Sequence, residues 1–89
     1  MPSKILTRDE YADALVRFYG EMRHEAIRRL LARTYQEAID RALHRFDGGQ
    51  QIYGDWDLTL KDWIGECDEE LDDAVAYLVA QRVRKERGL

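Results

Sequence analysis

Apolar residues recur at helical spacing along most of the chain, beginning just after residue 10. "TRDE" at residues 7–10 has the form of a capping box, in which a threonine and a glutamate satisfy the free amides of a first helical turn. Two apolar series follow at helical period. They are Tyr11, Leu15, Phe18 and Met22, then Ile27, Leu31, Tyr35, Ala38, Ala42 and Phe46. The series do not share one phase, so the chain is predicted either to bend near residues 20–25 or to rotate its buried face there. Residues 8–46 are predicted to form one long helix, bent or straight, or two nearly continuous helices.

Glycine and aspartate then interrupt the pattern in "DGGQQIYGDWD", residues 47–57. Gly48 is well placed to adopt the left-handed conformation that ends a helix. Ile52, Tyr53 and Trp56 are apolar enough to fold back on the helices. Residues 47–58 are therefore predicted to be an ordered loop.

A last apolar series predicts a helix over residues 59–84, capped by Asp57 or Thr59. Its members are Leu60, Trp63, Ile64, Cys67, Leu71, Ala74, Val75 and Leu78. The predicted fold is all-α, a single domain over residues 1–89 built as a long hairpin of two or three helices. Two amphipathic arms leave apolar stripes that they cannot cover for each other. We expect a homodimer or higher oligomer that completes a four-helix-type bundle.

Composition supports a soluble helical chain. Of its 89 residues, 45% are hydrophobic and 36% charged, with one proline. No apolar run reaches the roughly 18 to 20 residues that cross a bilayer, and "MPSKILTRDE" lacks the apolar run of a signal peptide. Cys67 is the only cysteine, which excludes an intrachain disulfide and a zinc-finger spacing. A cytoplasmic protein without a membrane partner is expected.

Charge is distributed unevenly. Residues 59–80 carry seven acids against Lys61, a net charge of -6, whereas residues 21–46 carry six arginines against four acids, a net charge of +2. These segments are electrostatically complementary, so packing them together would relieve acidic self-repulsion. The basic residues are interleaved with acids, the pI is about 5.1, and no nucleic-acid-binding signature is present. Nucleic acid is not the expected partner.

The acidic segment "ECDEELDDAV", residues 66–75, places Glu66, Glu70 and Asp73 on one helical stripe. Like charges at this spacing cost stability, so arginines of the first arm or a hard divalent cation are expected to compensate. The stripe borders the apolar face, where side chains can reach a cleft between helices. Asp68, Glu69 and Asp72 are expected to form a solvated face.

The stretch "DWIGECDEELDDAVAYLVA", residues 62–80, resembles the second metal-binding helix of MazG-like all-α nucleoside triphosphate pyrophosphohydrolases, short phage versions included. That superfamily carries EExxE on one helix and ExxD on a later one, and the two motifs hold magnesium beside the triphosphate. Residues 70–73 fit ExxD unchanged. Residues 36–40, "QEAID", are the nearest counterpart of EExxE, with glutamine and aspartate in place of two glutamates.

The resemblance implies hydrolysis of a nucleoside triphosphate to a monophosphate and pyrophosphate. The residues it implies are Glu37, Asp40, Glu70 and Asp73 as Mg²⁺ or Mn²⁺ ligands, Glu66 as an added ligand or water-orienting catalytic base, Lys61, Arg41 and Arg45 as phosphate contacts, and Trp56 or Tyr53 as a stacking surface for a base. Trp56 and Tyr53 are equally interpretable as a plug over the helix ends. The altered first motif leaves weakened or lost activity open. The alternative function is that of a non-enzymatic helical interaction factor of a phage or prophage.

Overall fold

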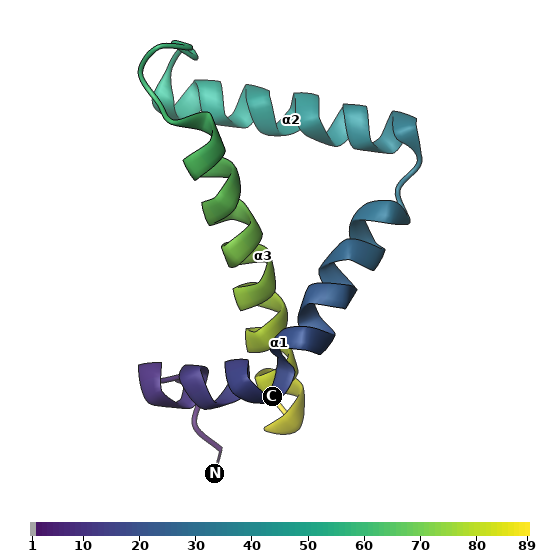
Figure 1. Cartoon of the computed structure of the whole chain (residues 1–89), viewed down its shortest axis with the longest axis vertical. Coiled ribbons are helices and arrows are strands. Elements are labelled where there is room, and N and C mark those ends of the chain that lie inside the picture. Colours follow the sequence, from purple (N-terminus) through teal and green to yellow (C-terminus); the bar gives the residue numbers. More distant parts are fainter. Residues whose placement is uncertain (1) are drawn as a thin grey trace.

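The computed structural model describes residues 2–89 and contains three helices: α1 (Arg8–Leu31), α2 (Tyr35–Tyr53) and α3 (Trp63–Glu86). Residues 2–89 contain no strand, which confirms the all-α prediction. The helices form an open triangle in which α2 connects the upper ends of α1 and α3, and α1 crosses α3 near the opposite corner (Figure 1). None of the described helices is long and apolar enough to cross a membrane.

The predicted capping box starts α1. The Thr7 hydroxyl accepts from the Glu10 amide at 3.3 Å, and Glu10 Oε1 accepts from the Thr7 amide at 3.1 Å. Arg87 Nη2 donates to the other oxygen of Glu10 at 2.6 Å. Arg87 also donates to the carbonyl oxygens of Ser3 and Ile5. One guanidinium thus ties the start of α1 to the end of the chain.

A second capping box separates α1 from α2. The Thr34 hydroxyl accepts from the Glu37 amide at 3.2 Å, and Glu37 Oε2 accepts from the Thr34 amide at 2.8 Å. Of the two interpretations of residues 8–46, two helices is therefore correct and one helix is wrong. The residues 34–37, "TYQE", repeat the pattern of "TRDE". Figure 1 also shows α1 changing direction near its middle, which is one of the two alternatives that the lost phase of its apolar positions left open.

The loop between the last two helices is shorter than predicted. α2 continues through Gly48 and Gly49 and ends only at Gly54, which has the positive φ of 83° that glycine tolerates. Placing the helix end at Gly48 was therefore wrong. The last helix begins at Trp63 with Asp62 as its cap, because Asp57 and Thr59 bond to each other in a turn instead. Helix α3 runs to Glu86, slightly beyond the predicted end.

The core lies where the first half of α1 crosses the second half of α3. Ala14, Phe18 and Met22 pack there with Val79, which has no exposed surface. The guanidinium groups of Arg17 and Arg82 lie 4.6 and 5.0 Å from the Phe18 ring. Each arginine also pairs with an acid of the other helix: Arg17 with Glu86 at 3.2 Å and Arg82 with Glu21 at 3.0 Å. These pairs frame a small apolar contact.

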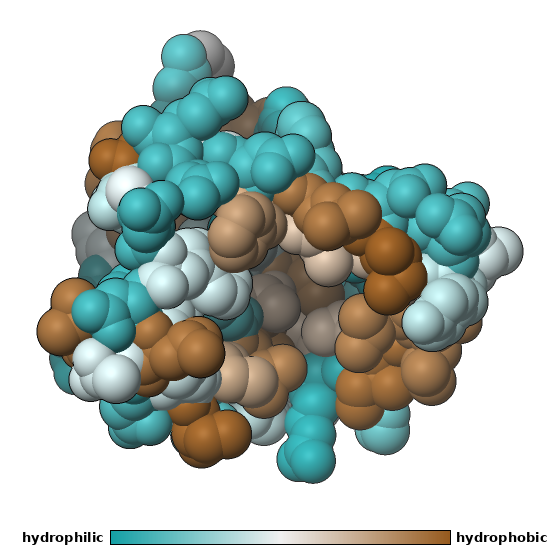
Figure 2. Space-filling model, turned by 90° about the horizontal axis from the view of Figure 1, so that it is seen from above, coloured by the Kyte–Doolittle hydropathy of each residue, from teal (hydrophilic) through white to brown (hydrophobic). Residues whose placement is uncertain are grey.

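Helix α2 packs against neither α1 nor α3 and has no buried residue. The radius of gyration is 16.2 Å, against about 12 Å for a compact domain of this length. The accessible surface is 7905 Å², against about 5,400 Å² for a compact monomer of this mass. Apolar side chains gather around a hollow on one face (Figure 2). A single chain is thus an open frame with one small core.

Replacing Val79 by alanine should lower the free energy of unfolding by about 2 kcal/mol, because it removes two buried methyl groups at the helix crossing. Val16→Ala is the matched control, since Val16 lies on α1, the other helix of the crossing, and is 88% exposed. That control should change the free energy by less than about 0.5 kcal/mol. Urea denaturation monitored by circular dichroism measures both. Equal effects of the two substitutions would contradict the proposed core.

Acid should weaken the anchored start of α1. Hydrogen bonds from the Thr7 amide and hydroxyl, and the nearby Arg87 charge, hold the pKa of Glu10 below its ordinary value of 4.5. A lowered folded pKa contributes stability above the ordinary value, and this stability is lost as pH falls through the folded pKa. The stability difference between the wild type and Glu10→Gln should therefore shrink between about pH 6 and about pH 3. A stability difference between the two proteins that does not change with pH would contradict a stabilising role of the Glu10 charge.

Candidate metal and nucleotide site

Three carboxylates of the predicted site lie along one stripe of α3. Glu66, Glu70 and Asp73 are all exposed. Glu70 precedes the buried Val79 by nine residues, which is about two and a half helical turns, so it lies on the side of α3 opposite the α1 contact. Within residues 2–89, no cationic side chain pairs with any of the three. The repulsion along this stripe is therefore uncompensated in the single chain.

The remaining α3 acids lie on other sides of the helix. Asp68, Glu69 and Asp72 are exposed, as expected for a solvated face. Asp72 also borders a shallow hollow beside α1, where it lies near Tyr11 and Val75. Asp72 therefore belongs to the edge of the α1 contact and not to the stripe that carries Glu70.

The carboxylates of the first motif lie on α2. Glu37 is in its first turn, where one oxygen accepts from the Thr34 amide at 2.8 Å, and Asp40 accepts from Gln36 Nε2 at 2.9 Å. Because α2 does not pack on α3, the chain does not bring this pair to Glu70 and Asp73. Residues 2–89 contain no group of three or more His, Cys, Asp or Glu side chains arranged to hold a metal ion. One chain alone does not assemble the four-carboxylate set.

The predicted phosphate contacts are separated as well. Arg41 and Arg45 are exposed on α2, and Lys61 is exposed in the loop at residues 54–62. None of the three makes an ion pair within the described part of the chain. Their guanidinium and ammonium groups are free to bind an anion, yet no contact links them to the acids of α3.

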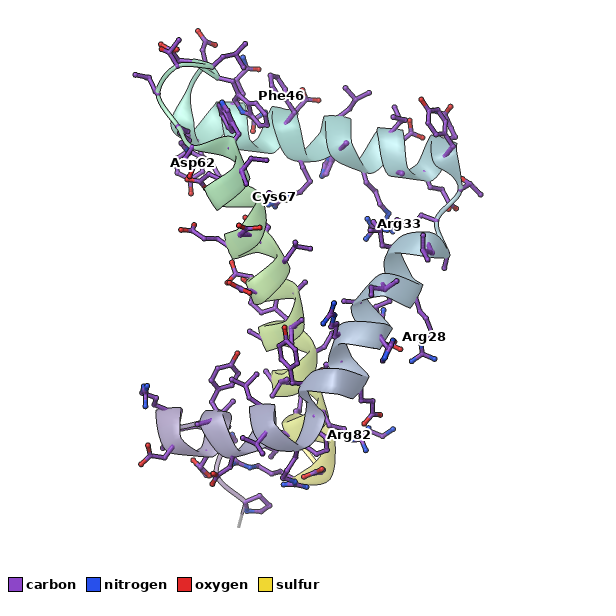
Figure 3. The ribbon with its side chains drawn as sticks, in the orientation of Figure 1. Arg28, Arg33, Phe46, Asp62, Cys67 and Arg82 are labelled. Carbon is purple, nitrogen blue, oxygen red and sulfur yellow. The ribbon has the colours of Figure 1, made fainter. Side chains whose placement is uncertain are left out.

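The aromatic side chains form a cluster at the corner between α2 and α3. The Trp56 ring lies 4.9 Å from that of Phe46 and stacks on Trp63, with 5.1 Å between centroids and 20° between planes. Trp63 Nε1 donates to the carbonyl oxygen of Leu58 at 3.1 Å. Figure 3 shows Phe46 and Asp62 at this corner. Trp56 thus packs between Phe46 and Trp63 while remaining 53% exposed, whereas Tyr53 is 84% exposed and has no aromatic partner among the described residues.

A tight turn orders the same loop. The Thr59 hydroxyl and amide donate to Asp57 Oδ1 at 2.7 and 2.9 Å. These bonds hold the pKa of Asp57 below its ordinary value, with the bond from the hydroxyl as the larger cause. The roles of Phe46 and Trp63 in the corner were missed from the sequence, where both were assigned to helical core positions. Two tryptophans seven residues apart on either side of a turn were the available signal.

A scan against protein-family models and searches of curated proteins and of solved structures found no match. The resemblance to MazG-like pyrophosphohydrolases therefore rests on residues 36–40 and 62–80 of this sequence.

Trp56→Ala should loosen the corner, because it removes both aromatic contacts of the loop. Amide hydrogen exchange should become faster at residues 54–62, and the free energy of unfolding should fall by about 1 kcal/mol. Tyr53→Ala is the control and should leave both quantities nearly unchanged, since Tyr53 packs against no aromatic ring. Identical exchange in the two variants would show that Trp56 does not hold the loop.

Proposed function

We propose that this protein acts as a self-associating, MazG-like helical protein that binds Mg²⁺ and hydrolyses a nucleoside triphosphate to a monophosphate and pyrophosphate. The observation that carries the proposal is the exposed stripe of Glu66, Glu70 and Asp73, which no cation of the described chain neutralises. The "ExxD" motif and the aromatic and acidic residues around it support the same function.

The donor set fits a hard cation. Carboxylate oxygens are the ligands that Mg²⁺ or Mn²⁺ takes in proteins, usually together with retained waters. When bound, the metal would neutralise phosphate charge and lower the pKa of a coordinated water. Glu70 and Asp73 would hold the metal, and Glu66, one turn earlier on the stripe, would orient the attacking water. Arg41, Arg45 and Lys61 would bind the phosphates.

Self-association supplies the rest of the site in this proposal. Glu37 and Asp40 would reach the α3 stripe from a neighbouring chain, because their own chain keeps the two helices apart. Glu37 uses one carboxylate oxygen in its capping box and retains the other for a metal. Helices from two chains would then form the four-helix-type bundle that one chain lacks.

A second candidate function is non-enzymatic interaction with other proteins, as in a small phage or prophage factor. The observation that favours it is the uncovered apolar surface of α2, where Tyr35, Leu43 and Ile52 are all exposed. The replacement of two glutamates by Gln36 and Asp40 in the first motif also favours it. In this function the α3 acids form a partner-binding face.

Metal titration distinguishes the two candidates. Mg²⁺ or Mn²⁺ should release or absorb heat in calorimetry and raise the melting temperature of the wild type, because the cation relieves repulsion on the stripe. Glu70→Gln and Asp73→Asn should weaken binding at least about tenfold, the loss of about 1.4 kcal/mol. Glu69→Gln is the control with the same charge change off the stripe and should bind as the wild type does.

Pyrophosphate release from a panel of nucleoside triphosphates then tests turnover. The enzyme proposal expects metal-dependent release that Glu66→Gln abolishes or slows strongly. Metal binding without release would support a scaffold that has lost its activity. No heat and no change in melting temperature would remove the enzyme proposal and leave the interaction function.

A further inference from the structure

We infer that residues 23–33, the last part of α1 and the two residues that follow it, dock on the first half of α3, residues 63–73, of a second copy of this chain. The inference rests on the self-association in the proposed function and is independent of hydrolysis. It identifies which surfaces meet, which the bundle proposal leaves open. Both surfaces lie beyond the crossing of α1 and α3, where the two helices diverge within one chain (Figure 1).

Both surfaces carry uncovered apolar side chains. On α1, Leu30 and Leu31 are 60% and 76% exposed, and Ile27 is also exposed. On α3, Ile64 and Leu71 are 73% and 60% exposed. Ile64 and Leu71 are seven residues apart, so they lie on one face two turns apart. Each surface is therefore an apolar strip on a helix that is already held by the core at its other end.

The two segments that carry these strips have opposite net charge. Residues 23–33 carry four arginines and one glutamate, a net charge of +3, whereas residues 63–73 carry six acids and no base, a net charge of -6. Glu25 pairs with Arg28 and Arg29, which leaves Arg23 and Arg33 without an ion pair in the described chain. Arg23 lies one turn before Ile27, and Asp68 lies one turn after Ile64. Charged groups thus border both apolar strips and would meet opposite charges across the contact.

The surplus surface matches what such a contact needs. The chain exposes about 2,500 Å² more than a compact monomer of its mass. A stable interface buries about 800 Å² on each partner. Each chain carries one basic and one acidic strip, so two copies related by a two-fold axis satisfy both strips at once and close the assembly.

Charge exchange between separate chains tests the inference. Variant one is Arg23→Glu and variant two is Asp68→Arg, because these residues border the two apolar strips and neither belongs to the proposed metal site. Each alone should self-associate at least about tenfold more weakly than the wild type, because residues 23 and 68, which face each other across the proposed contact, then carry charges of the same sign. An equimolar mixture should restore a one-to-one heterodimer in sedimentation and native mass spectrometry, because both contacts then join opposite charges. Arg8→Glu carries the same charge change as variant one and should associate normally, because Arg8 lies outside the strips.

Two results would overturn the docking surfaces while leaving self-association intact: variants that dimerise like the wild type, or a mixture that gains nothing. A monomeric wild type would overturn both. A second measurement avoids charge reversal. A Leu30→Cys, Cys67→Ser chain mixed with the native chain should form a crosslinked heterodimer through a short bis-maleimide. Val16→Cys, Cys67→Ser is the control and should form little, because Val16 lies outside the strips. Equal crosslinking of both would also contradict the inference.

Discussion

The packing of Phe18 and Met22 on Val79 is the contact on which the rest of the structure depends. It is where the described helices bury apolar side chains, and the flanking pairs of Arg17 with Glu86 and Arg82 with Glu21 join the same two helices. Exposed ion pairs of this kind contribute little by themselves. The apolar contact therefore fixes the crossing of α1 and α3, and the two helices diverge beyond this crossing.

That divergence explains why the candidate chemistry is dispersed. Helix α2 connects the diverging ends of α1 and α3 but packs against neither of them. The two carboxylate motifs, one on α2 and one on α3, therefore lie on helices that do not pack together within a chain. The same geometry keeps the basic segment 23–33 and the acidic segment 63–73 apart, and each segment carries an uncovered apolar strip. In the proposed assembly a second copy would cover the strips, and a neighbouring chain would supply the carboxylates of Glu37 and Asp40 that the chain's own fold keeps away from α3.

Capping sequences and apolar periodicity predicted the position of a helix well where the two signals agreed. "TRDE" gave the start of α1, and the change of apolar phase gave its bend. "TYQE" at residues 34–37 carried the same capping signal but was overlooked, because apolar residues continue at helical period across it. The predicted helix end at Gly48 is wrong, because glycine is only weakly unfavourable inside a helix, by about 1 kcal/mol, and the residues after Gly48 stay helical.

The arrangement of the site could not be predicted in the same way. The stripe of Glu66, Glu70 and Asp73 follows from helical geometry alone, and all three are exposed in the structure. Whether Glu37 and Asp40 meet them depends on contacts between helices, for which a single sequence carries no direct signal. Apolar periodicity likewise predicted that Ile64 and Leu71 are buried, but it did not indicate that the chain itself leaves both side chains exposed. Sedimentation equilibrium of the wild-type protein across micromolar concentrations tests the central claim most directly. The account predicts a mass of at least twice 10.5 kDa that falls on dilution, and a constant mass of 10.5 kDa would contradict it.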